Sequence, residues 1–100
     1  MTNHQAELLF KAAWPCLGFD AGALLSNDRH RSVVRARHIA MYAARMLGGS
    51  YPEIGRIFGG RDHGTVIYAC KRVNARIKGG DESVRRDVLA LLHAVESEAA

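Results

Sequence analysis

Apolar residues recur every three to four positions along most of this chain, which is the spacing of amphipathic helices. The first such stretch predicts a helix over residues 3–14, with Pro15 and Gly18 ending it. Its apolar face is formed by Ala6, Leu9, Phe10, Ala13 and Trp14. No stretch alternates in the manner of a half-buried strand, so the pattern favours an all-α fold.

A short helical turn and a long helix are expected next. Asp20 can cap the turn, which carries Leu24-Leu25 inward. A polar, basic loop at 26–31 separates it from a helix over 33–47, and Gly48-Gly49 supplies the left-handed stop. The apolar positions of the long helix are Ala36, Ile39, Ala40, Ala43, Met46 and Leu47, and its polar side carries Arg35, Arg37, His38 and Arg45.

The following segment has the form of a helix, a tight turn and a second helix. Ser50 and Glu53 have the spacing of a capping box, and Gly59-Gly60 ends this short helix. Asp62 then caps a helix that runs to Lys78. This second helix is expected to bury Val66, Ala69, Cys70, Val73 and Ile77 and to expose Gly64, Tyr68, Lys71 and Ala75, flanked by Thr65 and Arg72. Such a unit is a helix-turn-helix, which presents its second helix to the DNA major groove.

Size and composition fit one small folded domain over residues 1–100, closed by a last amphipathic helix from about residue 82. Hydrophobic residues make up 48% of the chain, enough for a modest core. No apolar run approaches the roughly 20 residues that span a bilayer, and no secretory pattern opens the sequence. Cys16 and Cys70 form no Cys-x-x-Cys pair, which favours two buried thiols in a reduced, cytoplasmic protein.

Positive charge is concentrated in the middle of the chain. The formal net charge is +4, yet eleven Lys or Arg residues lie between positions 29 and 78, against only two acids, Glu53 and Asp62. A cluster of this kind favours a polyanionic partner, because each neutralised phosphate releases condensed counterions. We therefore expect double-stranded DNA as the partner and no membrane.

Three groups of residues carry a resemblance to a known family. They are Arg31-Ser-Val-Val-Arg-Ala-Arg-His-Ile-Ala-Met41, Pro52-Glu-Ile-Gly55, and Phe58-Gly-Gly-Arg-Asp-His63 with Thr65-Val66 and Ala69-Cys70. Together they resemble the C-terminal DNA-binding domain, domain IV, of the bacterial replication initiator DnaA, over nearly the whole chain. The resemblance implies a compact helical bundle of the DnaA C-terminal or Trp-repressor-like kind that binds DnaA-box-like sites.

The resemblance also implies a set of DNA contacts. Base contacts fall on Arg29, Asp62, His63, Gly64, Thr65 and Tyr68, with Arg29 of the basic loop in the minor groove and the others in the major groove. Phosphate contacts fall on Arg31, Arg37, His38, Arg45, Arg61, Lys71 and Arg72. A carboxylate can accept a hydrogen bond from a cytosine amino group and a Thr methyl can pack on that of thymine. We expect Asp62 to cap its helix with one oxygen and keep the other free.

Two base-contact positions depart from the family pattern. Gly64 stands where the family usually has Thr, and Tyr68 where it usually has His. A good base contact is worth about 1–3 kcal/mol of discrimination, so these changes predict a relaxed or redirected site preference. The basic loop also carries Asp28 and His30 where the family tends to be more cationic.

Two functions remain open at this point. The first is sequence-preferring DNA binding by a nucleoid-associated protein that modulates DnaA-dependent replication initiation or transcription. The second is a protein-interaction module that contacts a replication-initiation or initiator-inactivation protein, with weak or no specific DNA binding. A third reading, a fragment of a full initiator, is less favoured because Met1-Thr2-Asn3 is a natural gene start.

Catalysis, cofactors and metals are not expected. No Gly-x-x-x-x-Gly-Lys-Ser/Thr sequence occurs, so we expect no nucleotide binding and no ATPase activity. Asp62, His63 and Thr65 follow one another at a helix start, where side chains diverge and form no nucleophile–base chain. The five histidines show no metal-ligand spacing with one another or with the cysteines.

Overall fold

The computed structural model describes residues 1–99, and every regular element in this range is helical. The helices are α1 (Asn3–Leu17), α2 (Ala21–Leu25), α3 (Arg31–Met46), α4 (Tyr51–Ile57), α5 (His63–Lys78) and α6 (Glu82–Ala99). The radius of gyration of 12.1 Å is close to the value of about 13 Å typical of a folded 100-residue domain. The prediction of a compact all-α bundle is therefore confirmed. Within residues 1–99, no helix has the length and apolar character that crossing a membrane requires.

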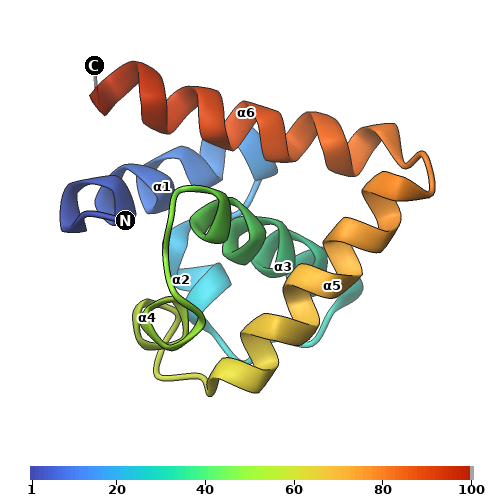
Figure 1. The fold of residues 1–100 in the computed structure, drawn as a ribbon, viewed down its shortest axis with the longest axis horizontal. Coiled ribbons are helices and arrows are strands. Elements are labelled where there is room, and N and C mark those ends of the chain that lie inside the picture. Colours follow the sequence, from blue (N-terminus) through green and yellow to red (C-terminus); the bar gives the residue numbers. More distant parts are fainter. Residues whose placement is uncertain (100) are drawn as a thin grey trace.

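The bundle is built around α3, which contacts every other helix. Helix α6 packs along α1, while α5 packs along α3 and against α4 (Figure 1). The largest fully buried side chains come from α1, α2, α3, α4 and α6 and from Phe58, which caps the end of α4. The helical ones are Leu9, Leu24, Ile39, Met41, Ile54 and Leu91. This core leaves the outer side of α5 uncovered, so the second helix of the helix-turn-helix faces solvent.

The expected helix caps are present. Ser50 and Glu53 form the predicted capping box, with each side chain accepting from the backbone N–H of the other residue. The carboxylates of Asp20 and Asp62 accept from backbone N–H groups at the starts of α2 and α5. Because these bonds satisfy N–H groups that have no partner inside the helix, they fix where α4 and α5 begin.

The predicted end of the first helix at Pro15 is wrong. Helix α1 continues through Pro15 to Leu17, and the backbone turns at Gly18, which has φ 79° and donates its N–H to the carbonyl of Trp14. Proline in the last turn forfeits one backbone bond, whereas the left-handed conformation at Gly18 ends the helix outright.

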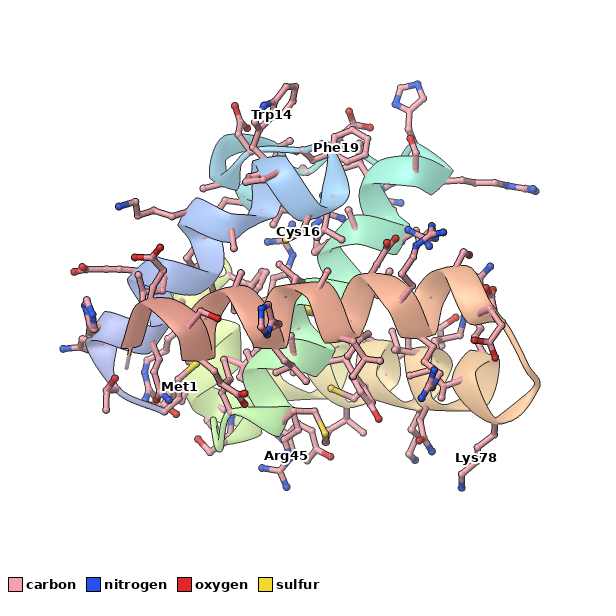
Figure 2. The ribbon with its side chains drawn as sticks, turned by 90° about the horizontal axis from the view of Figure 1, so that it is seen from above. Met1, Trp14, Cys16, Phe19, Arg45 and Lys78 are labelled. Carbon is pink, nitrogen blue, oxygen red and sulfur yellow. The ribbon has the colours of Figure 1, made fainter. Side chains whose placement is uncertain are left out.

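Three side chains expected in the core are exposed instead. Trp14 is 66% exposed, Met46 54% and Leu25 38%. The buried face of α1 is Leu8, Leu9, Ala12 and Ala13, so Trp14 lies beyond its edge. Figure 2 shows Trp14 projecting on the side of the molecule opposite to Arg45 and Lys78. Both cysteines are free thiols, with Cys70 buried and Cys16 half-buried.

Candidate nucleic-acid interface

Glycine makes the tight turn between α4 and α5 possible. Gly59 and Gly60 adopt φ 80° and 77°, a conformation that residues with a Cβ rarely adopt. Gly55 lets the turn approach α4, since a Cβ there would lie 2.1 Å from the carbonyl oxygen of Arg61. At this contact the N–H of Arg61 donates to the carbonyl of Gly55 at 2.9 Å. The turn is therefore bonded to α4, and the first residue of α5 has a defined position.

The start of α5 exposes the four residues that the resemblance assigns to base contacts. Asp62, His63, Gly64 and Thr65 are all solvent-exposed. One carboxylate oxygen of Asp62 accepts from the N–H of Thr65 at 3.0 Å, and the other accepts from the Thr65 hydroxyl at 3.3 Å. The expectation that the second oxygen is free is therefore wrong. The hydrogen bond from the Thr65 N–H is also the main cause that lowers the pKa of Asp62, so this carboxylate is charged.

Gly64 has a structural consequence at the same place. A Cβ at residue 64 would lie 2.9 Å from the capping oxygen of Asp62. A side chain there would make the carboxylate shift, although a flexible side-chain oxygen can move at modest cost. Gly64 thus allows the Asp62–Thr65 pair to form in the geometry seen here, while it offers DNA no side chain of its own.

Tyr68 stands one turn further along α5 and is 57% exposed. Its ring meets the ring of His38 edge-on, with centroids 6.0 Å apart and an interplanar angle of 82°. The guanidinium of Arg72 lies 6.0 Å from the Tyr68 centroid. Burial lowers the pKa of His38, and the cations of Arg37 and Arg72 lower it further. His38 is therefore neutral near pH 7 and can donate a hydrogen bond to phosphate but adds no charge.

Arg37, expected on the polar side of its helix and assigned to a phosphate contact, is buried instead. Only 7% of this residue is exposed. Its guanidinium donates to three backbone carbonyls: Nε to Leu24 at 2.9 Å, and Nη2 to Ser26 at 2.9 Å and Asp28 at 3.0 Å. Burial is the main cause that lowers its pKa. Because these bonds fold the basic loop onto α3, Arg37 fixes the loop rather than contacting phosphate.

Arg61 joins the same loop to the helix-turn-helix. Its Nη2 donates to the carbonyl of Ser26 and its Nη1 to the carbonyl of Phe58. The Ser26 carbonyl therefore accepts from Arg37 of α3 and from Arg61 of the turn at once. This shared oxygen ties the basic loop to the start of α5, so the loop and α5 are held at a fixed separation.

The tip of the basic loop presents Arg29 beside an acidic neighbour. Asp28 accepts from the backbone N–H and from the imidazole of His30, and the backbone bond is the main cause that lowers the pKa of Asp28. Arg29 itself is exposed.

Arg45, at the end of α3, has its guanidinium carbon 4.3 Å from the centroid of the Tyr51 ring and points into solvent (Figure 2). The remaining predicted phosphate contacts, Arg31, Lys71 and Arg72, are also exposed.

Sequence reasoning missed the role of Arg37, although a signal was present. Arg37 lies four residues from both Val33 and Met41, which are buried in α3. Residues four apart share a helix face, so this spacing places Arg37 on the inward side. Sequence reasoning also missed two ion pairs, that of Arg35 in α3 with Asp87 of α6 and that of Arg76 in α5 with Asp81, which lies just before α6.

Comparison with known families assigns a chain with this architecture to a family of helix-turn-helix domains. A family described as bacterial dnaA protein helix-turn-helix matches residues 16–73. The matched segment is more than half of the chain and contains the basic loop, α3, α4, the glycine turn and most of α5. The chain therefore belongs to the bacterial DnaA helix-turn-helix family of DNA-binding domains.

Proposed function

We propose that this protein binds double-stranded DNA at DnaA-box-like sites and thereby modulates DnaA-dependent replication initiation or transcription. The observation that carries the proposal is the hydrogen bond from Arg61, in the turn before α5, to the Ser26 carbonyl of the basic loop, which joins the two proposed reading elements. With α5 in the major groove, the basic loop reaches the adjacent minor groove. A protein with this function acts on the nucleoid in the bacterial cytoplasm, and binding of this kind needs no nucleotide.

Base reading is assigned to Arg29 and to the exposed first turns of α5. The Asp62–Thr65 pair presents a charged carboxylate and a methyl group together, which suits a cytosine amino group and a neighbouring thymine methyl. His63 and Tyr68 are exposed beside it. Since Gly64 offers no side chain and Tyr68 replaces the usual His, we expect the preferred site to differ from the usual box at one or two base pairs.

Phosphate binding is assigned to the exposed cations around this surface. The set is Arg31, Arg45, Lys71 and Arg72, with His38 as a neutral donor and Arg61 through the guanidinium N–H groups that its carbonyl bonds leave free. Contacts of this kind fix the orientation of a protein on the duplex without carrying sequence information.

Fluorescence anisotropy on a DnaA-box duplex and on a scrambled duplex, across a salt series, tests the proposal. Arg29→Ala and Thr65→Ala should weaken binding to the box more than binding to the scrambled duplex. Lys71→Ala should weaken both alike and lower the salt slope by about one. Lys11→Ala, which removes one exposed charge from α1, is the matched control. Equal, salt-labile binding of the wild-type protein to both duplexes would contradict the site preference.

The alternative function, a protein-interaction module, has one observation in its favour. The carboxylate of Asp28 lies next to Arg29 on the loop that would enter the minor groove, where negative charge opposes DNA. Under this alternative the DnaA-like surface contacts a replication-initiation protein. Absence of binding to either duplex, together with preserved cellular activity of Arg29→Ala and Thr65→Ala, would favour it.

A further inference from the structure

A cationic groove of about 800 Å³ lies between α3, α5 and the first turn of α6. Five arginines line it: Arg29, Arg31, Arg35, Arg72 and Arg76. Three of them, Arg29, Arg31 and Arg72, belong to the proposed DNA contacts. Arg35 and Arg76 do not, and they extend the positive surface away from the base-reading end of α5.

Two carboxylates and a hydroxyl, those of Asp81 just before α6 and of Asp87 and Ser83 within it, hold these two arginines in place. Arg35 pairs with Asp87 at 2.9 Å and donates to the Ser83 hydroxyl at 3.3 Å. Arg76 contacts one oxygen of Asp81 through both Nε and Nη2, each at 3.1 Å. A guanidinium has five N–H donors, so each arginine keeps several for a ligand. Because the side chains are already ordered, binding would cost less conformational entropy.

The spacing along α5 relates the groove to bound DNA. Tyr68, Arg72 and Arg76 follow one another at intervals of four residues and line the same groove. Arg76 lies eleven residues after Thr65, which is about 16 Å along a helix at roughly 1.5 Å per residue. The major groove is only about 12 Å wide. If Thr65 reads a base, Arg76 lies beyond the edge of the groove, at the level of the flanking phosphates.

We propose that this groove is a second phosphate-binding site, in which Arg76 and Arg35 contact the backbone of the bound duplex outside the base pairs that α5 reads. The inference rests on the proposed DNA-binding function. Arginine suits this task because its planar fork matches two phosphate oxygens. The two carboxylates, Asp87 of α6 and Asp81 just before it, lie outside the residues that match the family, so this chain uses residues after the matched segment to arrange part of its DNA surface.

Arg76 is the better residue to test, because its side chain is 47% exposed in its ion pair with Asp81, whereas that of Arg35 is 28% exposed in its pair with Asp87. The experiment compares the wild-type full chain with Arg76→Gln, Arg76→Lys and the charge-matched control Lys11→Gln. Anisotropy is measured on the box duplex and the scrambled duplex from about 50 to about 200 mM salt. Thermal unfolding of each variant verifies that it is folded.

Arg76→Gln should weaken binding to both duplexes about three- to tenfold and reduce the salt slope by about 0.9. The ratio of the dissociation constant of Arg76→Gln to that of the wild type should then shrink about threefold between about 50 and about 200 mM salt. Arg76→Lys should keep the wild-type slope, since it keeps the charge. Shortening the duplex by half a turn on one side should weaken the wild type and leave Arg76→Gln unaffected.

The outcomes separate this inference from the proposed function. An Arg76→Gln slope equal to that of Lys11→Gln, with the wild type still binding, would overturn the groove contact alone. A wild type that binds neither duplex would overturn both. In a last measurement, inorganic tripolyphosphate is added to the complex of the wild type with the box duplex. If micromolar tripolyphosphate displaces the duplex from the wild type and not from Arg76→Gln, the groove binds a free oligophosphate and the duplex assignment is overturned.

Discussion

Replacing Gly55 by alanine should destabilise the protein by a predictable amount. The added Cβ would lie 2.1 Å from the carbonyl oxygen of Arg61, well inside the 3.0 Å below which neighbouring atoms must shift. The turn must therefore move by about 1 Å, at an overpacking cost of about 1–3 kcal/mol. The 2.9 Å bond from the Arg61 N–H to Gly55 is lost or stretched, which costs about 0.5–1.5 kcal/mol.

One term opposes these costs. Alanine is favoured over glycine inside a helix by about 1 kcal/mol, which leaves a net loss of about 0.5–3.5 kcal/mol. For a chain of this size the midpoint of thermal unfolding should fall by roughly 2–28 °C. Binding to the box duplex should weaken more than binding to the scrambled duplex, because the displaced turn moves the base-reading end of α5 and leaves its cations in place.

Thermal and urea unfolding followed by circular dichroism measure the stability change, and anisotropy measures the change in binding. Gly22→Ala is the matched control, since a Cβ at this position of α2 meets only a carboxylate oxygen of Asp20 at 3.3 Å. That variant should be as stable as the wild type or more stable by up to about 1 kcal/mol, since it gains the helix preference of alanine without a backbone clash. A Gly55→Ala protein as stable as Gly22→Ala would refute the argument that the turn needs this close approach.

Three further predictions concern buried and capping groups. Arg37→Met should lower the free energy of unfolding by about 2–4 kcal/mol in urea titrations, because the carbonyls of Leu24 and Asp28 lose this donor and that of Ser26 keeps only Arg61. Burial lowers the pKa of His38 below 6.5, so the unfolded chain takes up this proton first and stability should fall as the pH drops below about 6.5. His38→Gln should flatten that slope. The bond from the Thr65 N–H lowers the pKa of Asp62 below 3.8, so its stabilising effect is present above 3.8 and is lost as the pH falls through the lowered value. Asp62→Asn keeps the cap and should remove this part of the acid transition in pH-dependent unfolding.

The sequence predicted the parts of the fold that short-range chemistry decides. The Ser50–Glu53 capping box and the Asp62 cap depend on residues three positions apart, and both formed as expected. The buried and exposed faces of α5 followed from its helical period in the same way, with Val66 and Ala69 buried and Tyr68 exposed. Each of these features needs no knowledge of the rest of the chain.

The features that failed depend on contacts between distant segments. Arg37 binds carbonyls nine to thirteen residues away, and a pattern of charged residues cannot show that those carbonyls converge on it. Trp14 fits an apolar face by spacing, but no helix in the described chain covers it. The second oxygen of Asp62 is a local exception: it accepts from Thr65, three residues away, because the side-chain rotamers bring the hydroxyl within 3.3 Å.

The Ser26 carbonyl joins two of the three segments that carry the resemblance to DnaA. One segment supplies Arg37 from α3 and the other supplies Arg61 from the glycine turn, and both guanidiniums donate to this single oxygen. A protein that reads adjacent major and minor grooves must hold its two reading elements at the spacing of the grooves before it binds. If either arginine is lost, the loop can move relative to α5, and the ordering cost is then added to every binding event. If the protein has the proposed function, DNA recognition depends on two residues that need touch no base, and Arg61→Met should lower the preference for the box while every proposed base-contacting side chain is intact.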